Sequence, residues 1–289
     1  QDISQKSNEF LRLNLILNNL VHSLGNVIHG DTLLNPAHLN KEKNGLAKFD
    51  YIVSNPPFKT DFSETRDQLA DDKYKDRFCC GVPTIPKKDV DKMPIYVLFI
   101  QHILYSLKDF GKAAIVVPTG FLTAKTGVER KVLEYIINKN YINGVISMPS
   151  NVFATTGTNV SVLLISKNKQ DDNVLLIDAS DLGEKIKEGK KQRTILHPID
   201  LEKITNVYMN KVIEKDFSVS VSINEIKNNN FYLNPGQYFE LEIPCCNLSK
   251  SEFKEYISKE MIELINLFDE SDKLEKDIID KMKDLDYDL

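Results

Sequence analysis

The sequence predicts an α/β fold, in which a doubly wound, largely parallel sheet carries helices on both faces and a helical tail follows. Two observations predict the sheet: short runs of almost purely apolar residues, such as 112–118, alternate with segments of helical periodicity. A third predicts the tail, because apolar residues recur at three- and four-residue steps from Phe253 to Leu285.

The first third of the chain contains one predicted helix and two predicted strands. Apolar residues in 4–22 recur at helical spacing, 26–31 predicts a short strand that ends in a turn, and 49–54 predicts a second strand. The second strand ends at the tetrapeptide Asn-Pro-Pro-Phe, residues 55–58. The polar stretch 59–92 is too long for a simple connection, so we expect a functional loop or an insertion there.

Helices and strands alternate again in the middle of the chain. We expect helices at 95–108 and 127–138, and strands at 112–118, 142–148, 158–165 and 174–178. The strands at 142–148 and 158–165 are joined by a glycine-containing loop with no helix between them. We therefore expect them to form an antiparallel hairpin that closes one edge of the sheet.

The character of the sequence changes after residue 185, which predicts three regions. Residues 1–185 form the catalytic domain, 186–248 an irregular extension, and 249–289 an amphipathic helical tail. Within the extension we expect a charged linker or exposed surface near 184–193 and a helix over 198–212. The tail begins with Ser-Lys-Ser-Glu, a capping box for a long helix or a helical hairpin.

Composition and charge exclude several classes of protein. Hydrophobic residues make up 42% and charged residues 27%, as in ordinary globular chains. The net charge of −5 resides in the tail, so residues 1–248 are almost neutral and any contact with nucleic acid must be local or shared with a partner. No apolar run is long enough to cross a bilayer and no signal peptide is visible, so we expect a cytoplasmic protein without a membrane contact.

Cysteine and histidine spacing does not indicate a metal site. The four cysteines form two adjacent pairs, Cys79 with Cys80 and Cys245 with Cys246, and adjacent residues seldom direct both sulfurs at one metal. The five histidines show no ligand-like spacing. We expect free thiols and assign no metal.

The tetrapeptide 55–58 carries the most specific chemistry in the chain. Catalytic groups of open α/β sheets lie at the carboxyl ends of strands. The Asn55 side-chain carbonyl and the rigidly held Pro56 main-chain carbonyl are two acceptors for the hydrogens of an amino group. Phe58 offers a ring face on which a flipped base can stack. These groups suit alkylation of the amino nitrogen of adenine, whereas a plain strand-ending turn would need none of them.

The chain resembles a known family through five segments, one of which contains this tetrapeptide. It is similar to the modification (M) subunits of type I restriction–modification systems, which are adenine-N6 DNA methyltransferases. The matching segments, in the family's order, are 29–33 (His-Gly-Asp-Thr-Leu), 49–58, 110–121, 147–153 with Thr156 and Gly157, and 232–238 (Tyr-Leu-Asn-Pro-Gly-Gln-Tyr).

The resemblance implies a fold, a cofactor and partners. The fold is the doubly wound sheet of methyltransferases that use S-adenosylmethionine (AdoMet). Asp2 falls where the family's acidic residue binds the cofactor ribose, and Asp31 where its acid contacts the cofactor adenine. Asn55, Pro56 and Phe58 take the target-base roles. Duplex DNA and a specificity (S) subunit are the implied partners, and a restriction (R) subunit is compatible with the family.

One departure from the family is large. No two of the twelve glycines are separated by a single residue, so the Gly-x-Gly turn that holds the methionine end of AdoMet is absent from the sequence. We therefore expect an N-terminally incomplete sheet and a chain that is inactive alone. A non-catalytic assembly fragment is the corresponding alternative function.

A second alternative is a protein-glutamine N5 methyltransferase, because that class also uses an Asn-Pro-Pro-aromatic turn. Tyrosine is usual at the last position there, whereas this chain has Phe58. The long stretch 59–92 also suits the DNA enzyme better. Because it contains eight basic residues and directly follows Phe58, we expect it to be mobile without DNA and to close over bound DNA.

Overall fold

The computed structural model describes residues 1–153, 158–189, 191–239 and 249–283. The chain divides into two compact units, Gln1–Phe239 and Glu240–Leu289. The boundary that we expected after residue 185 therefore lies inside the first unit. The matched residues Thr156 and Gly157 and the cysteines at 245 and 246 lie outside the described residues.

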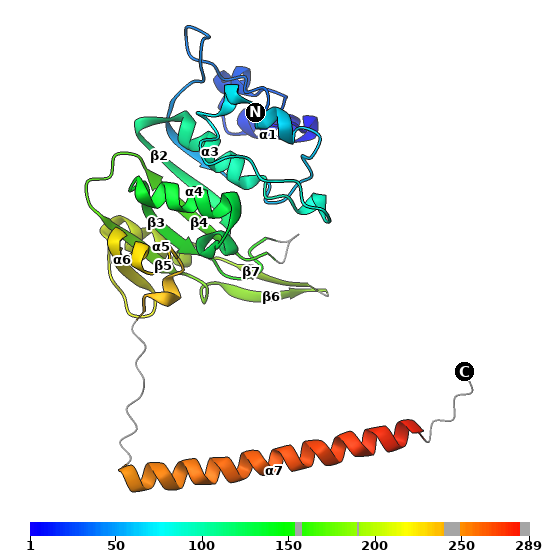
Figure 1. The fold of residues 1–289 in the computed structure, drawn as a ribbon. Helices are drawn as coiled ribbons and strands as arrows, with labels where there is room; N and C mark the ends of the chain where they lie inside the picture. Colours follow the sequence, from blue (N-terminus) through cyan, green and yellow to red (C-terminus); the bar gives the residue numbers. More distant parts are fainter. Residues whose placement is uncertain (154–157, 190, 240–248, 284–289) are drawn as a thin grey trace. The chain divides into compact units, whose positions relative to one another are not determined.

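Within the described residues, one sheet of six strands organises the first unit (Figure 1). The spatial order is β1-β2-β4-β3-β5-β8. Pairs β1–β2 and β3–β5 are parallel, while β4 is antiparallel to both neighbours and β8 is antiparallel to β5. The strands are β1 (Phe49–Ser54), β2 (Leu107–Pro118), β3 (Ile142–Ser147), β4 (Val160–Ser166), β5 (Asn173–Asp178) and β8 (Ser218–Ser222).

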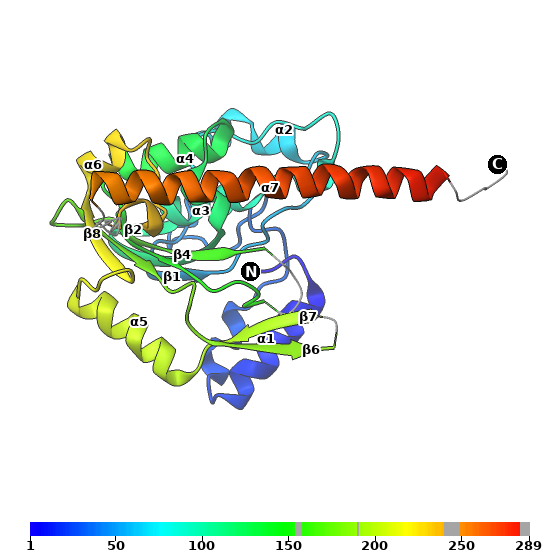
Figure 2. The same ribbon diagram turned by 90° about the horizontal axis from the view of Figure 1, so that it is seen from below.

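Helices cover both faces of the sheet, which confirms the predicted α/β fold (Figure 2). The sheet is mixed rather than largely parallel as expected, because β4 and β8 run antiparallel to their neighbours. Helices α3 (Tyr96–Ser106), α4 (Gly127–Asn138) and α6 (Ile223–Asn228) contribute to one apolar core. Helix α5 (Pro198–Asn210) buries Ile204 and Val207 in a second core on β3 and β5. The predicted helices at 95–108, 127–138 and 198–212 are confirmed, because each has an apolar face that matches a sheet face.

Strand β4 differs from the sequence-based expectation of a hairpin at the sheet edge. It is antiparallel to β3, as expected, but it lies between β2 and β3 in the sheet interior. The physical reason is its burial: Val160, Leu163 and Ile165 are all buried. The backbone N–H and C=O groups of such a buried strand are shielded from water. They therefore need hydrogen-bond partners in neighbouring strands on both sides.

The predicted strand at 26–31 is wrong. The segment forms a single parallel bridge, between Asp2 and His29, and no longer strand. Asp2 leaves the extended conformation almost at once, because Ser4 caps helix α1 (Gln5–Leu17). The helix predicted at 4–22 is shorter in the structure, where it ends at Leu17. A 3-10 turn, Val21–Asn26, follows it.

Helix α1 exposes the apolar side of its periodicity. Exposed side chains include Phe10, Leu13 and Leu17, and the same holds for Leu20 beyond the helix. Together these side chains form an exposed apolar surface, the kind of surface that marks interaction sites in many proteins.

Two segments that we expected to be irregular are regular. Strands β6 (Glu184–Glu188) and β7 (Lys191–Ile195) form an antiparallel pair, in which each strand satisfies the other's backbone groups. Residues 218–228 form β8 and α6, and β8 pairs with β5 at the sheet edge. In β8, Ser218 and Val221 are buried, and because they are three residues apart they lie on opposite faces of the sheet.

Residues 59–92 pack rather than extend as an open loop. They contain α2 (Arg66–Leu69) and two 3-10 turns, Asp72–Tyr74 and Val90–Lys92. Their buried side chains join a separate small core made of Leu33, Phe62, Leu69, Phe78, Val82, Met93 and Leu98. The expectation that the segment is mobile without DNA and closes over bound DNA stays a prediction.

The second unit consists, in its described part, of helix α7 (Lys250–Lys283). The predicted capping box is confirmed: the Ser249 N–H donates to Glu252 Oε2 at 2.7 Å and the Glu252 N–H donates to Ser249 Oγ at 3.3 Å. The helix is continuous, so the hairpin alternative does not apply to 250–283. Its apolar side chains, among them Met261, Leu264 and Phe268, are exposed. Among the described residues no helix combines the length and apolar character needed to cross a membrane.

Candidate active site

The Asn-Pro-Pro-Phe tetrapeptide follows β1 at the carboxyl end of the strand. Because β1 is parallel to β2, this end lies at the edge of the sheet where ligands bind in open α/β folds. Pro56 is buried and fixes the start of the loop, whereas Asn55 is exposed. No described residue hydrogen-bonds the Asn55 side chain. Its carbonyl oxygen is therefore available to a substrate.

Phe58 is half-buried and is held by a stack of aromatic rings. Its ring lies edge-on to Tyr96 with centroids 6.4 Å apart, and Tyr96 lies edge-on to Phe121 at 5.7 Å. Tyr96 is 1% exposed and its hydroxyl donates to Glu129 Oε1. Burial raises the pKa of the Tyr96 hydroxyl, and the Glu129 carboxylate raises it further, so the phenol stays protonated.

The sequence reasoning missed Tyr96 and Glu129 as supports of the tetrapeptide. Tyr96 begins an almost wholly apolar helix, and Glu129 lies in the first turn of α4. The helix contains two tyrosines, Tyr96 and Tyr105, and a tyrosine in such a helix is a signal that its hydroxyl has a partner. The identity of that partner required the tertiary structure, because 33 residues separate the two side chains.

The two predicted cofactor acids are brought together on neighbouring segments. The Asp2 N–H donates to Ile28 O at 3.2 Å and the Gly30 N–H donates to Asp2 O at 2.9 Å. This bridge places Asp2 beside the turn that Asp31 begins. Asp31 Oδ1 accepts the N–H groups of Leu33 and Leu34 at 2.7 and 3.0 Å.

Each of the two carboxylates uses one oxygen locally. Asp2 Oδ1 accepts the Ser4 N–H at 2.7 Å, as Asp31 Oδ1 does for its own turn. Within the part of the chain that the structure describes, Oδ2 of Asp2 and of Asp31 has no hydrogen-bond partner. Both acids therefore combine a turn-forming role with one oxygen that can accept from a ligand.

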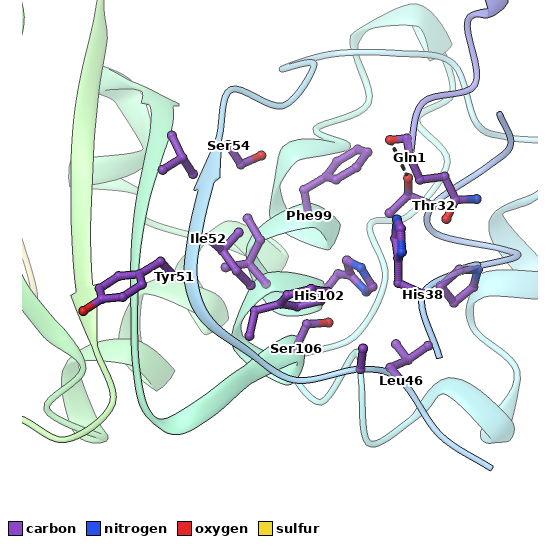
Figure 3. A pocket seen from close by; sticks show the side chains of 15 residues that line it. Gln1, Thr32, His38, Leu46, Tyr51, Ile52, Ser54, Phe99, His102 and Ser106 are labelled. Carbon is purple, nitrogen blue, oxygen red and sulfur yellow. Dashed lines mark hydrogen bonds between the residues drawn. The ribbon is translucent and has the colours of Figure 1, made fainter. Parts of the chain in front are cut away.

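A cavity of about 360 Å³ lies beside β1 (Figure 3). Gln1 and Thr32, which adjoin Asp2 and Asp31 in the sequence, are among the residues that line it. Tyr51 and Val53 of β1 also line it, and they are 76% and 86% exposed. Among the described strands, β1 lies at the edge of the sheet, which agrees with the expected incomplete sheet.

Two histidines that the sequence left unassigned lie in the wall of this cavity. Burial lowers the pKa of His102 to about 4, and the positive charges of Arg77 and Lys48 act in the same direction. Burial also lowers the pKa of His38, with a smaller contribution from the N-terminal ammonium. His102 is therefore neutral near pH 7, and it presents an uncharged ring to the cavity.

Asp2 and Asp31 fit the nucleoside end of AdoMet in their chemistry, because their available oxygens can accept hydrogen bonds from hydroxyl and amino groups. The described residues that line the cavity include no glycine, so a close backbone cradle for the methionine end is not formed by them.

Metal ligands do not converge in the described residues, where no group of three His, Cys, Asp or Glu side chains could hold an ion. The Sγ atoms of Cys79 and Cys80 are 3.9 Å apart and both thiols are free. Burial raises the pKa of the Cys80 thiol to about 12, with a further contribution from Cys79, so this pair is a poor metal ligand at neutral pH.

Comparisons with known proteins agree with this geometry. The family model described as N-6 DNA Methylase matches residues 1–243. The type I restriction enzyme MpnII methylase subunit of Mycoplasma pneumoniae is 30% identical over 297 residues, which covers 100% of this chain and 50% of that protein. The HindI methylase subunit of Haemophilus influenzae is 25% identical and covers 82% and 51%, respectively.

A solved structure of a methyltransferase subunit has a similar fold. The type I restriction-modification system methyltransferase subunit from Streptococcus thermophilus superposes with a TM-score of 0.67 at 26% identity, covering 82% of this chain and 47% of that one. The chain thus spans about half the length of the relatives that it matches. The sheet order, the strand-end tetrapeptide and the family match over most of the sequence lead to one conclusion: this chain belongs to the N-6 DNA methylase family.

Proposed function

We propose that this chain is the target-base part of a type I M subunit, which transfers a methyl group from AdoMet to the N6 amino group of adenine in DNA. The observation that carries the proposal is the exposed Asn55 side chain, with no described partner, beside a Phe58 ring that buried aromatic groups hold in place. The relatives, which are named methylase subunits of type I restriction enzymes, support the substrate class.

The tetrapeptide would act by binding the amino group of the flipped adenine. The Asn55 side-chain carbonyl and the Pro56 main-chain carbonyl accept its two hydrogens, which turns them away from the base plane and makes the nitrogen lone pair more nucleophilic. Phe58 stacks on the base and excludes water from one face. Bound AdoMet supplies the electrophilic methyl group.

The cofactor roles of Asp2 and Asp31 belong to the same proposal. The Oδ2 atom of Asp2 accepts from the ribose hydroxyls and that of Asp31 accepts from the adenine amine of AdoMet. Because the relatives are about twice as long, we propose that the other half of the subunit supplies the strand that pairs with β1 and the glycine turn. The exposed apolar face of α1 is consistent with a second segment that covers it.

The partners in this proposal are duplex DNA, an S subunit and, in the restriction complex, an R subunit, all in the cytoplasm. Helix α7 is the surface that we assign to the S subunit. Its 34 residues carry exposed apolar side chains along their length, and a helix of that kind is normally covered by another helix.

A methylation assay on the complete subunit, assembled with its S subunit, tests the proposal. Asn55→Ala should lower N6-methyladenine formation by on the order of 10²–10³, because one preorganised acceptor is lost, and should leave AdoMet affinity unchanged. Asn168→Ala, an exposed asparagine after β4 at the opposite end of the sheet, is the matched control. Normal methylation by the Asn55→Ala protein would refute the mechanism.

Two alternatives give different results in the same assay. A protein-glutamine methyltransferase would modify a glutamine-containing peptide and leave duplex DNA unmodified. An assembly fragment would support complex formation while Asn55→Ala had no effect on methylation. For the isolated chain, the open edge of β1 favours the assembly fragment over the glutamine methyltransferase. The reason is that the described residues do not form the part of the cofactor site that would hold the methionine end.

A further inference from the structure

The segment 59–92 contacts the turn that Asp31 begins. The Tyr74 hydroxyl donates to Leu34 O at 2.8 Å, and Arg77 Nη2 donates to Leu33 O. These two carbonyls belong to the residues whose N–H groups bond to Asp31 Oδ1. The turn is therefore fixed from both sides, by its own aspartate and by two side chains that are about 40 residues distant in the sequence.

Apolar packing holds the same contact in place. Leu33 is 3% exposed and lies in the small core that also contains Phe62 and Phe78 of the segment. Arg77 is 5% exposed, and its guanidinium carbon lies 4.6 Å from the Tyr74 ring centroid and 4.5 Å from that of Phe78. The Arg77 guanidinium therefore packs against both rings while Nη2 bonds to Leu33 O, and its Nε and Nη1 are buried without a hydrogen-bond partner among the described residues.

Both arginines of the segment contact backbone carbonyls of this chain. Arg66 Nε donates to Pro83 O at 3.1 Å, and Arg77 bonds to Leu33 O. Lys73 and Lys92 are exposed, and their contacts lie at the surface: the Lys73 ammonium is 4.7 Å from the Tyr74 ring and Lys92 pairs with Asp89 at 3.2 Å.

We propose that residues 59–92 are a clamp that holds the Asp31 turn in the conformation that cofactor binding requires, with Tyr74 and Arg77 as its positioning residues. The proposal rests on the proposed function, which assigns Asp31 to AdoMet. It is an alternative to the expectation that this segment closes over DNA. The clamp acts through backbone carbonyls, so its effect on the cofactor is indirect: it sets where Asp31 Oδ2 points.

The test uses Tyr74→Phe, which keeps the ring packing and removes one hydrogen bond. In the 289-residue chain, amide hydrogen exchange at Leu33 and Leu34 should accelerate about fivefold, the effect of one lost hydrogen bond on local opening. Tyr238→Phe is the control, because its hydroxyl also donates to a backbone carbonyl, that of Tyr232 at 2.6 Å. It should leave exchange at Leu33 and Leu34 unchanged.

A second readout measures the cofactor in the complete subunit. Tyr74→Phe should weaken AdoMet binding about fivefold and raise the KM for AdoMet, while kcat and the KM for DNA stay the same. Arg77→Met should weaken AdoMet binding more, and Arg77→Lys should restore part of the loss, because it keeps the charge.

The outcomes separate this proposal from the proposed function. Unchanged exchange at Leu33 and Leu34 in Tyr74→Phe overturns the clamp. Faster exchange with unchanged AdoMet affinity also overturns it, because the turn would then not matter for the cofactor. A raised KM for DNA alone would return the segment to a DNA-binding role. If the proposed function fails, the wild-type subunit itself makes no N6-methyladenine, a result that the exchange measurement does not affect.

Discussion

Phe58 lies edge-on to Tyr96, with ring centroids 6.4 Å apart and an interplanar angle of 77°. Phe58 ends the exposed tetrapeptide, whereas Tyr96 is buried at the start of α3 and bonds to Glu129 of α4. The partly exposed ring that we assign to the target base is therefore held by two helices of the core. Preorganisation of this kind lowers the cost of ordering the loop when a base enters.

Removing the Tyr96 ring should disturb this support more than removing its hydroxyl. Tyr96→Phe should destabilise the fold by about 1–3 kcal/mol, because Glu129 loses its donor, and should leave the KM for DNA nearly unchanged. Tyr96→Ala should cost about 3–5 kcal/mol and raise that KM. Urea denaturation and methylation kinetics on the complete subunit measure both. Equal KM values for the two variants would contradict the role of the ring.

The isolated chain should self-associate through the open edge of β1. Unpaired backbone groups beside the exposed side chains of Tyr51 and Val53 form a template for another strand. Sedimentation velocity should detect oligomers, and Val53→Lys should reduce them because a charge blocks edge pairing. Ile199→Lys, at an exposed aliphatic position of α5, serves as the control and should have no such effect. A strictly monomeric wild-type chain would refute this prediction.

The isolated chain should also bind AdoMet weakly or not at all. Asp2 and Asp31 offer acceptors for one end of the cofactor, and the described cavity wall includes no glycine for the other end. Calorimetric titration of the chain should therefore show no micromolar binding. Such binding, if found, would mean that other residues of this chain rebuild the cofactor site.

Helix α7 should be required for assembly and dispensable for folding of the first unit. Deleting 249–289 should leave the thermal unfolding of Gln1–Phe239 unchanged and prevent co-purification with the S subunit. Leu264→Asp should weaken assembly, because it places a charge among the apolar side chains of the helix. Glu263→Gln alters a neighbouring acidic residue and should retain binding. Assembly by the truncated chain would show that another surface binds the S subunit.

Acid should destabilise the fold through His102. Its pKa is about 4 in the folded chain and about 6.5 when unfolded, so the unfolded state binds more protons between these values. Stability should therefore fall as the pH drops from about 6.5 to about 4, by up to about 3 kcal/mol, and this contribution should level off below pH 4. Denaturant titrations at several pH values measure it. His102→Gln should flatten the slope in that window, and His22→Gln, at an exposed position, should not.

The local pattern of the sequence was sufficient for most helices and strands. Each of α3, α4, β1, β3 and β5 appears where apolar periodicity predicted it. The Ser249 capping box needed only side chains within one helical turn. The tetrapeptide 55–58 could also be recognised from the sequence, since a strand end followed by Asn-Pro-Pro-Phe places the exposed hydrogen-bond acceptor of Asn55 beside the Phe58 ring. All of these features depend on neighbours in the chain.

Features that depend on distant partners were decided only by the tertiary structure. Periodicity gives β4 two buried faces but does not say which strands flank it, and the structure places it between β2 and β3. The polar composition of 59–92 predicted a loop. In the structure, however, the few apolar side chains of this segment pack with Leu33 in a small core. Likewise, Tyr96 became the support of Phe58 because folding brought α3 beside the end of β1. The sequence by itself determined the strand-end chemistry and the helical periodicities. Strand order, the clamp on Asp31 and the packing of the Tyr96 ring against Phe58 arose from long-range packing. The energy of such packing cannot be inferred from a local sequence pattern.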